Sequence, residues 1–190
     1  MLFQNKINYD KIKTKGGMYM NKVNLSIKGE YVDTIRYANG EVEVIKGENL
    51  IVDGLLNLVT ALLGCKSGHT GLKYWAVGQG QSAWDSDNTQ PNKADTRLSS
   101  ELGRKEISAS DIKWVDEHGS DSPTPTNRLK VRVTFGAGDC VGVWREFGLF
   151  GGDATSSADS GIMINHKHHS VITKTGEMEI EREIIFTFSS

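Results

Sequence analysis

The segment 178–188 near the C-terminus constrains the fold more than any other part of the chain. The segment begins as a strict alternation, with Met178, Ile180 and Arg182 on one face and Glu179, Glu181 and Glu183 on the other. Apolar side chains then continue through Ile184, Phe186 and Phe188. Side chains of a β-strand alternate between its two faces, so the pattern predicts a strand with one buried face. At a sheet edge, so apolar a strand would expose unpaired backbone groups, and we therefore expect it inside a sheet.

Several upstream segments also have strand character. Residues 23–46 contain two β-rich runs around Asn39-Gly40, a pair that favours a tight hairpin whose two turn residues take positive φ. Further strands are expected at 74–77, within 104–115, where Trp114 is an expected anchor, and within 143–174. Segment 128–135 is expected to bury the alternate side chains Leu129, Val131, Val133 and Phe135.

Residues 50–63 change to helical spacing. Their leucines recur at intervals of three and four, and Gly64 is expected to end the helix. So apolar a helix is expected to pack against the sheet rather than in a partner's groove. The predicted fold is mainly β: an antiparallel β-sandwich or barrel-like domain with one packed α-helix and an N-terminal arm. One core is expected to contain Leu55, Leu58, Leu62, Trp144, Phe147, Leu149, Ile184 and Phe186.

The predicted organisation is an extended N-terminal arm over residues 1–19 and a single β-rich domain over residues 20–190. The arm is polar, has four lysines and ends at Gly16-Gly17. We expect it to lie outside the domain and to contact another chain, since a polar arm has little to pack against within its own fold. Translation from either Met1 or Met20 is compatible with this pattern.

Composition argues against several classes of protein. The net charge is −2 and the pI is about 6.2, so no basic surface for nucleic acid or membrane is expected. No run reaches the roughly 20 apolar residues of a membrane span, and the N-terminus lacks the apolar centre of a signal peptide. Cys65 and Cys140 are expected to be reduced thiols, since no CxxC motif is present.

The histidine cluster 166–169 is the sharpest chemical feature. On a strand, His166 and His168 lie on one face and could bind a transition metal. No further ligand is spaced to complete a metal site within one chain. Three copies of the chain around a threefold axis would supply six imidazoles to one ion. The alternative is a polar, pH-sensitive cluster, and we expect His166, His168 and His169 at or near a subunit contact. No other cofactor is expected.

Enzyme signatures are weak. The acidic loop Asp85-Ser86-Asp87-Asn88 lacks the Gly and the distal Glu of a calcium loop. No nucleophile elbow and no HExxH motif occurs. A glycosidase-like carboxylate pair remains open if two of Glu101, Glu106, Glu146 and Asp153 meet in space. The chain is not expected to be an enzyme.

Residues 50–190 carry a resemblance to a known class of proteins. The pattern begins with Tyr74-Trp75-Ala76-Val77-Gly78-Gln79-Gly80 and Thr96-Arg97-Leu98, followed by Glu101 and Arg104. It continues in Arg145, Glu146, Gly148, Leu149, Phe150, Met163, Ile164, Asn165, His169, Ile172, Thr173, Lys174 and Thr175. This order resembles structural proteins of tailed-phage virions, among them tail-fibre, collar and baseplate-associated components.

The resemblance implies a non-enzymatic part of a virion, assembled in the host cytoplasm. Expected partners are other virion proteins and further copies of the chain. The alternatives are a capsid decoration protein, or a β domain that binds a receptor or a host surface glycan. For a glycan, Tyr74, Trp75 and Trp84 would form the stacking platform, provided that they are exposed together. A hydrolase on a β scaffold is a weaker alternative.

Overall fold

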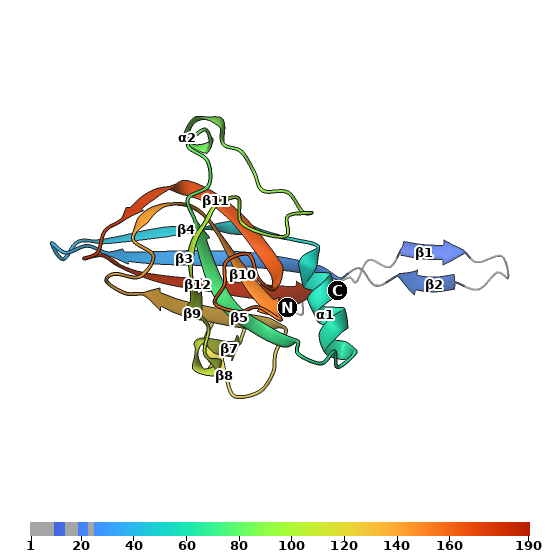
Figure 1. Ribbon diagram of the computed structural model, residues 1–190. Helices are drawn as coiled ribbons and strands as arrows, with labels where there is room; N and C mark the ends of the chain where they lie inside the picture. Colours follow the sequence, from blue (N-terminus) through green and yellow to red (C-terminus); the bar gives the residue numbers. More distant parts are fainter. Residues whose placement is uncertain (1–9, 14–18, 23–24) are drawn as a thin grey trace.

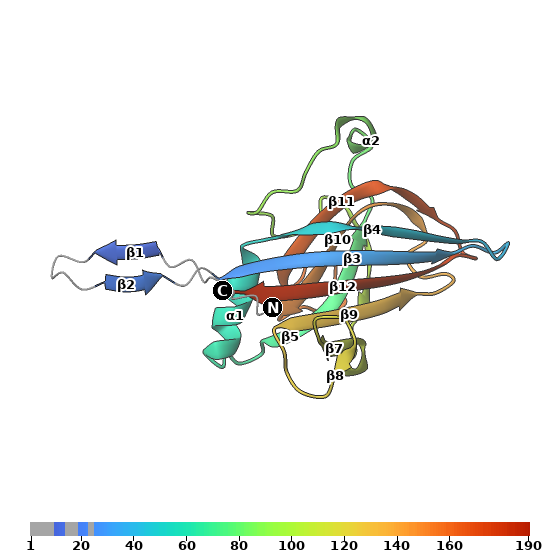
Figure 2. The ribbon, with the colours of Figure 1, turned by 180° about the vertical axis from the view of Figure 1, so that it is seen from behind.

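The computed structural model describes residues 10–13, 19–22 and 25–190 (Figures 1 and 2). Two short strands, β1 (Asp10–Lys13) and β2 (Tyr19–Lys22), pair with each other. The longer strands are β3 (Ser26–Arg36), β4 (Val42–Ile51), β5 (Thr70–Gly78), β6 (Glu101–Glu106), β9 (Arg128–Phe135), β10 (Gly142–Gly152), β11 (Ile162–Lys174) and β12 (Glu179–Ser189). The shorter ones are β7 (Ile112–Val115) and β8 (Asp121–Ser122), and the helices are α1 (Gly54–Leu63), the single turn α2 (Trp84–Asp87) and a 3₁₀ turn at Ala109–Asp111.

Ten strands form one antiparallel sheet in the order β6-β5-β10-β11-β4-β3-β12-β9-β7-β8. The sheet bends between β11 and β4, where only two residue pairs connect the strands, Asn165 with Ile51 and His166 with Leu50. The strands on either side of this bend are called the β10 half (β6, β5, β10, β11) and the β3 half (β4, β3, β12, β9, β7, β8). The two halves cross over one another in a sandwich-like arrangement, and β6 and β8 remain as separate edges, so the described strands do not close into a barrel (Figure 1).

The terminal strand lies inside the sheet, as its pattern predicts. β12 pairs with β3 on one side and with β9 on the other. Its buried face carries Ile180, Arg182, Ile184 and Phe186. The alternation of β9 is also confirmed, because Val131, Val133 and Phe135 are buried.

The main core fills the space between the two halves. From the β10 half come Trp75, Trp144, Phe147 and Leu149, and from the β3 half come Tyr31, Ile35, Val131, Phe135, Ile180, Ile184 and Phe186. A bulge in β10 between Trp144 and Glu146 explains how Trp144 and Phe147 both face this core although they are three positions apart. The same bulge places Glu146 on the opposite, outer face of the β10 half.

Helix α1 contributes less to the core than its leucines suggest. Leu55 and Leu58 are buried in a separate cluster with Ile164, so the expectation of a single core is wrong. Leu62 is 41% exposed and Leu63 is 81% exposed, because α1 packs along one side only. The helix ends as expected near Gly64, but the left-handed residue is Cys65, with φ of 50°.

The β3–β4 hairpin occurs where Asn39-Gly40 predicts it, with a different turn. The amide of Gly40 donates to the carbonyl of Tyr37 (3.0 Å), and the amide of Tyr37 donates to the carbonyl of Glu41 (2.9 Å). Only Gly40 takes a positive φ, 86°, so the connection is a three-residue loop rather than a two-residue turn.

The arm prediction concerns residues that largely lie outside the described part. Residues 1–9 and 14–18 are not described, and β2 extends past the predicted boundary at residue 19. The contact with another chain stays a prediction.

Two further expectations can be compared with the described residues. Trp114 is 42% exposed, so it is not the buried anchor that was expected. No helix among the described residues is both long and apolar enough to span a membrane.

Candidate functional site

The segment 79–100 covers the outer face of the β10 half. Leu98, which is 2% exposed, packs there with Tyr74, Ala76, Phe150 and Met163. The buried carboxylate of Glu146 fixes both ends of this cover. It accepts hydrogen bonds from the amides of Gly80 (3.1 Å), Ser99 (2.9 Å) and Ser100 (2.9 Å). One side chain of β10 thereby satisfies three backbone donors that a buried loop would otherwise leave unpaired.

The preceding residue, Arg145, holds the middle of the same segment. Its guanidinium donates two hydrogen bonds to the Asp85 carboxylate (2.7 and 2.9 Å) and one to the Gln79 carbonyl (3.2 Å). Asp85 belongs to the acidic loop 85–88, which was compared above with a calcium-binding loop, and its carboxylate binds an arginine side chain. A bidentate arginine–carboxylate pair fixes orientation as well as distance.

His166 lies between two carboxylates. Its Nε2 is 3.0 Å from Glu146 Oε2 and its Nδ1 is 2.7 Å from Asp95 Oδ2. The side chain is only 3% exposed. Through its two nitrogen atoms, the ring therefore bridges Glu146 of β10 and Asp95 of the segment 79–100.

His168 lies beside His166 on the same face of β11. The two ring centroids are 4.7 Å apart, and Trp84 stacks on the His168 ring at 3.7 Å. The Nδ1 of His168 is 2.8 Å from the Thr89 carbonyl, which makes Nδ1 the donor. Its Nε2 is buried and has no hydrogen-bond partner among the described residues.

The register of β10 and β11 brings Glu146 to this histidine pair. Glu146 is directly opposite His168, and His166 lies two residues earlier on β11. One ligand atom of each residue lies within 4.8 Å of the other two. The sequence correctly places the two imidazoles on one face, and the structure adds beside them, within the same chain, a third potential ligand that was not expected. That ligand lies twenty residues away, across a strand pair and next to a bulge, and spacing alone does not reveal it.

Electrostatics distinguish the members of this cluster. Burial opposes ionisation of Glu146, but hydrogen bonds from His166, Ser99 and Ser100 outweigh it and lower the pKa of the carboxyl. Burial lowers the pKa of His168, so this imidazole favours its neutral form. A charged carboxylate and a neutral imidazole are the forms in which these side chains bind metals.

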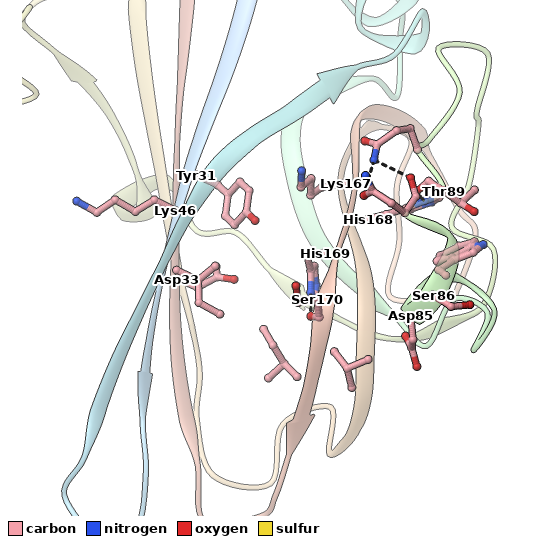
Figure 3. Close-up of a pocket in the computed structure, with 16 residues that line it drawn as sticks. Tyr31, Asp33, Lys46, Asp85, Ser86, Thr89, Lys167, His168, His169 and Ser170 are labelled. Atoms are coloured by element: carbon pink, nitrogen blue, oxygen red, sulfur yellow. Dashed lines mark hydrogen bonds between the residues drawn. The ribbon is translucent and has the colours of Figure 1, made fainter.

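Two pockets border His168. The one in Figure 3 has a volume of about 460 Å³ and lies at the bend of the sheet, between Tyr31 and Asp33 of β3, His168 and His169 of β11, and the loop residue Thr89. The other, of about 490 Å³, is lined by residues 90–99 together with Trp84, His166 and His168. The cluster is therefore reachable from solvent past His168, while Glu146 is fully buried.

His169 does not belong to this group. It lies on the other face of β11, 6.0 Å from the ring of Phe147, and its Nδ1 is 2.7 Å from the Ser170 carbonyl. Burial lowers the pKa of His169 to about 3, and nearby Arg182 acts in the same direction. The three histidines therefore do not form one surface cluster. The His166 side chain is 3% exposed and faces Asp95 and Glu146 of its own chain, which does not fit a threefold metal site at the surface. The subunit contact expected at or near the histidines stays a prediction.

The predicted glycan platform is not assembled. Trp75 is fully buried in the main core, whereas Tyr74 is 9% exposed and packs on the opposite face of β5. Trp84 is partly exposed and stacks on His168 instead. Adjacent residues of a strand face opposite sides, so Tyr74 and Trp75 could not both join one surface.

The four carboxylates considered for a hydrolase have separate surroundings. Glu101 binds Arg104 at 2.6 and 2.7 Å and accepts a hydrogen bond from the amide of Asp159. Glu146 is occupied by the loop amides and His166, whereas Glu106 and Asp153 are exposed. Each of the two buried carboxylates thus fixes a loop.

Comparison with models of known protein families and with curated proteins finds no match to this chain. Inference about function therefore rests on the arrangement of the residues described above.

Proposed function

We propose that the protein is a non-enzymatic structural component of a tailed-phage virion, placed in the tail as part of the fibre, collar or baseplate and acting through subunit contacts. One observation carries the proposal. Four charged residues of the pattern that resembles phage virion proteins, Glu101, Arg104, Arg145 and Glu146, attach loops to one face of the β10 half.

The four residues form two arginine–glutamate sets, each on one strand, and each set holds one loop. Arg145 and Glu146 of β10 hold the segment 79–100. Arg104 and Glu101 of β6 hold the loop 153–161, where Arg104 donates to the carbonyls of Thr155 (2.9 Å) and Ser160 (3.1 Å). The Arg104 and Glu101 side chains are only 3% and 2% exposed, so solvent screens this pair little.

The apolar part of the pattern lies between the same strands. Leu149 is opposite Asn165, whose side-chain oxygen accepts a hydrogen bond from the Leu149 amide (2.8 Å), and Phe150 is opposite Met163. A face built in this way presents loops in fixed positions. Such preorganised loops suit repeated contacts between subunits, because little conformational entropy is lost on assembly.

The surface also offers apolar area for such contacts. On α1, Leu56, Leu62 and Leu63 are 53%, 41% and 81% exposed. Large apolar side chains gathered on one short helix are typical of protein–protein interfaces rather than of free surface.

The test is to look for the chain in particles. Particles of the phage whose genome encodes the chain should be purified, analysed by mass spectrometry and imaged by electron cryomicroscopy. We expect a fixed number of copies per particle and density for the ten-stranded domain in the tail. Purified infectious particles that lack the chain would overturn the proposal, and density on the capsid would place it as a decoration protein instead.

A further inference from the structure

We propose that Glu146, His166 and His168 form a binding site for one divalent transition-metal cation of the zinc type within a single chain. The site would link β10 to β11 beneath the segment 79–100, whose residues Asp95 and Thr89 contact the two histidines. This inference is independent of the proposed role in a virion, because it rests on the geometry of the cluster alone.

The ligand atoms are one carboxylate oxygen of Glu146 and the Nε2 atoms of both histidines. One potential ligand atom of each residue already lies within 4.8 Å of those of the other two, and His166 Nε2 is 3.0 Å from Glu146 Oε2. With metal–ligand bonds of about 2.0–2.2 Å, ligand atoms around a metal are separated by about 3–4 Å, so the cluster needs to contract by about 1 Å. Two imidazoles and one carboxylate form a borderline donor set that suits Zn²⁺ and its neighbours better than Ca²⁺ or Mg²⁺.

The surroundings orient both rings for this task. The Nδ1 of His166 faces Asp95 at 2.7 Å, and the Nδ1 of His168 faces the Thr89 carbonyl at 2.8 Å. When Nδ1–H donates to such an acceptor, the lone pair of the neutral ring is on Nε2 and points away from it. Carboxylate and carbonyl partners of this kind typically support metal-bound histidines.

The Nε2 of His168 provides a further argument. It is buried and lacks a hydrogen-bond partner among the described residues, and a buried polar atom without a partner requires an explanation. A metal ion would supply that partner. At His166, the ion would lie on the side of Nε2, which faces Glu146 Oε2 at 3.0 Å. The fourth position opens towards the pocket of residues 90–99 and would hold a water molecule.

The experiment uses the full chain without a polyhistidine tag, stripped with a chelator and titrated with Zn²⁺ by calorimetry. Co²⁺ serves as a spectroscopic probe, since its visible absorption reports low-symmetry coordination by nitrogen and oxygen. We expect one ion per chain, a higher melting temperature with Zn²⁺, and slower proteolysis within 79–100.

The matched variants are His168→Phe, which keeps an aromatic ring against Trp84, and His118→Phe, which alters a histidine whose side chain is 79% exposed. We expect His168→Phe to lose at least about tenfold in Zn²⁺ affinity, and His118→Phe to bind as the wild type does. Wild-type protein that binds no Zn²⁺, or a folded His168→Phe protein with unchanged affinity, would overturn the proposal. So would a cobalt spectrum with thiolate bands that disappear in Cys65→Ser.

Discussion

The charge of Arg182 on β12 is buried together with that of Asp33, the residue directly opposite on β3. The Arg182 guanidinium donates two hydrogen bonds to the Asp33 carboxylate, both of 2.6 Å, and the two side chains are 0% and 1% exposed. The guanidinium also lies 4.2 Å from the centroid of the Phe147 ring. A charge in this position is tolerated because the carboxylate and the ring replace the lost water.

Asp33→Asn should therefore be costly although it is nearly isosteric. The variant leaves the Arg182 charge buried without its counter-charge, and we expect a loss of about 3–5 kcal/mol in the free energy of unfolding. The matched control is Glu183→Gln, next to Arg182 on the other face of β12, which removes the partner of the half-exposed Arg132 and should cost less than about 1 kcal/mol. Urea denaturation measures both, and equal losses would contradict this account.

The Asp139 carboxyl should make the free energy of unfolding depend on pH. A hydrogen bond from Lys105 (2.5 Å) lowers the pKa of this carboxyl below its ordinary value of 3.8, and the Gly136 amide acts in the same direction. A folded-state pKa below the unfolded value stabilises the protein above the unfolded value. That contribution is lost as the pH falls from about 4 through the folded-state pKa.

Asp139→Asn should accordingly be less stable than the wild type at neutral pH, and the difference should shrink as the pH falls below about 4. Urea denaturation over this range tests the prediction, with Asp153→Asn, whose side chain is exposed, as the control. A difference that is constant with pH would show that the carboxylate charge is not responsible.

At the scale of elements, the contact between β10 and β11 depends on Gly148. A Cβ at this position would lie 2.7 Å from Met163 Cε and 2.8 Å from the Asn165 carbonyl oxygen. The methionine end could move, but the backbone oxygen could not do so without breaking the strand pair. This close approach explains a glycine in the middle of a strand.

Gly148→Ala should destabilise the protein by about 1–3 kcal/mol, as overpacking does. Gly71→Ala in β5 is the matched control, because a Cβ there meets nothing within 4 Å and the substitution should be neutral or slightly stabilising. The melting temperatures of the two variants should move apart, and a neutral Gly148→Ala would contradict the tight contact.

At the scale of the whole molecule, Phe147 joins the two halves of the sheet. Its ring lies 5.1 Å from Tyr31 of the β3 half and 5.8 Å from Trp75 of the β10 half. Among the described residues, backbone pairing connects the two halves only through two residue pairs between β4 and β11. Their cohesion therefore comes from side-chain packing more than from backbone pairing.

Phe147→Ala should cost about 3–5 kcal/mol, the usual loss for a fully buried aromatic ring. Trp114→Ala, which removes a larger ring that is 42% exposed, should cost clearly less. Thermal and urea unfolding measure both. A Phe147→Ala protein as stable as Trp114→Ala would show that this ring does not hold the halves together.

The sequence by itself determined what depends on neighbours along the chain. The alternation in β9 and β12 identified their buried faces, Asn39-Gly40 located a hairpin, and the leucines of 55–63 identified a helix. These features follow from the periods of two residues in a strand and 3.6 in a helix, which any short segment expresses.

Tertiary structure alone decided which distant residues meet. Whether Glu146 faces His168, Asp33 faces Arg182, or Leu62 reaches the core depends on strand register, a bulge and the side on which α1 packs. A shift of one residue in register would turn every side chain of a strand to the other face. The local pattern is compatible with several registers, and the packing of the two halves selects one.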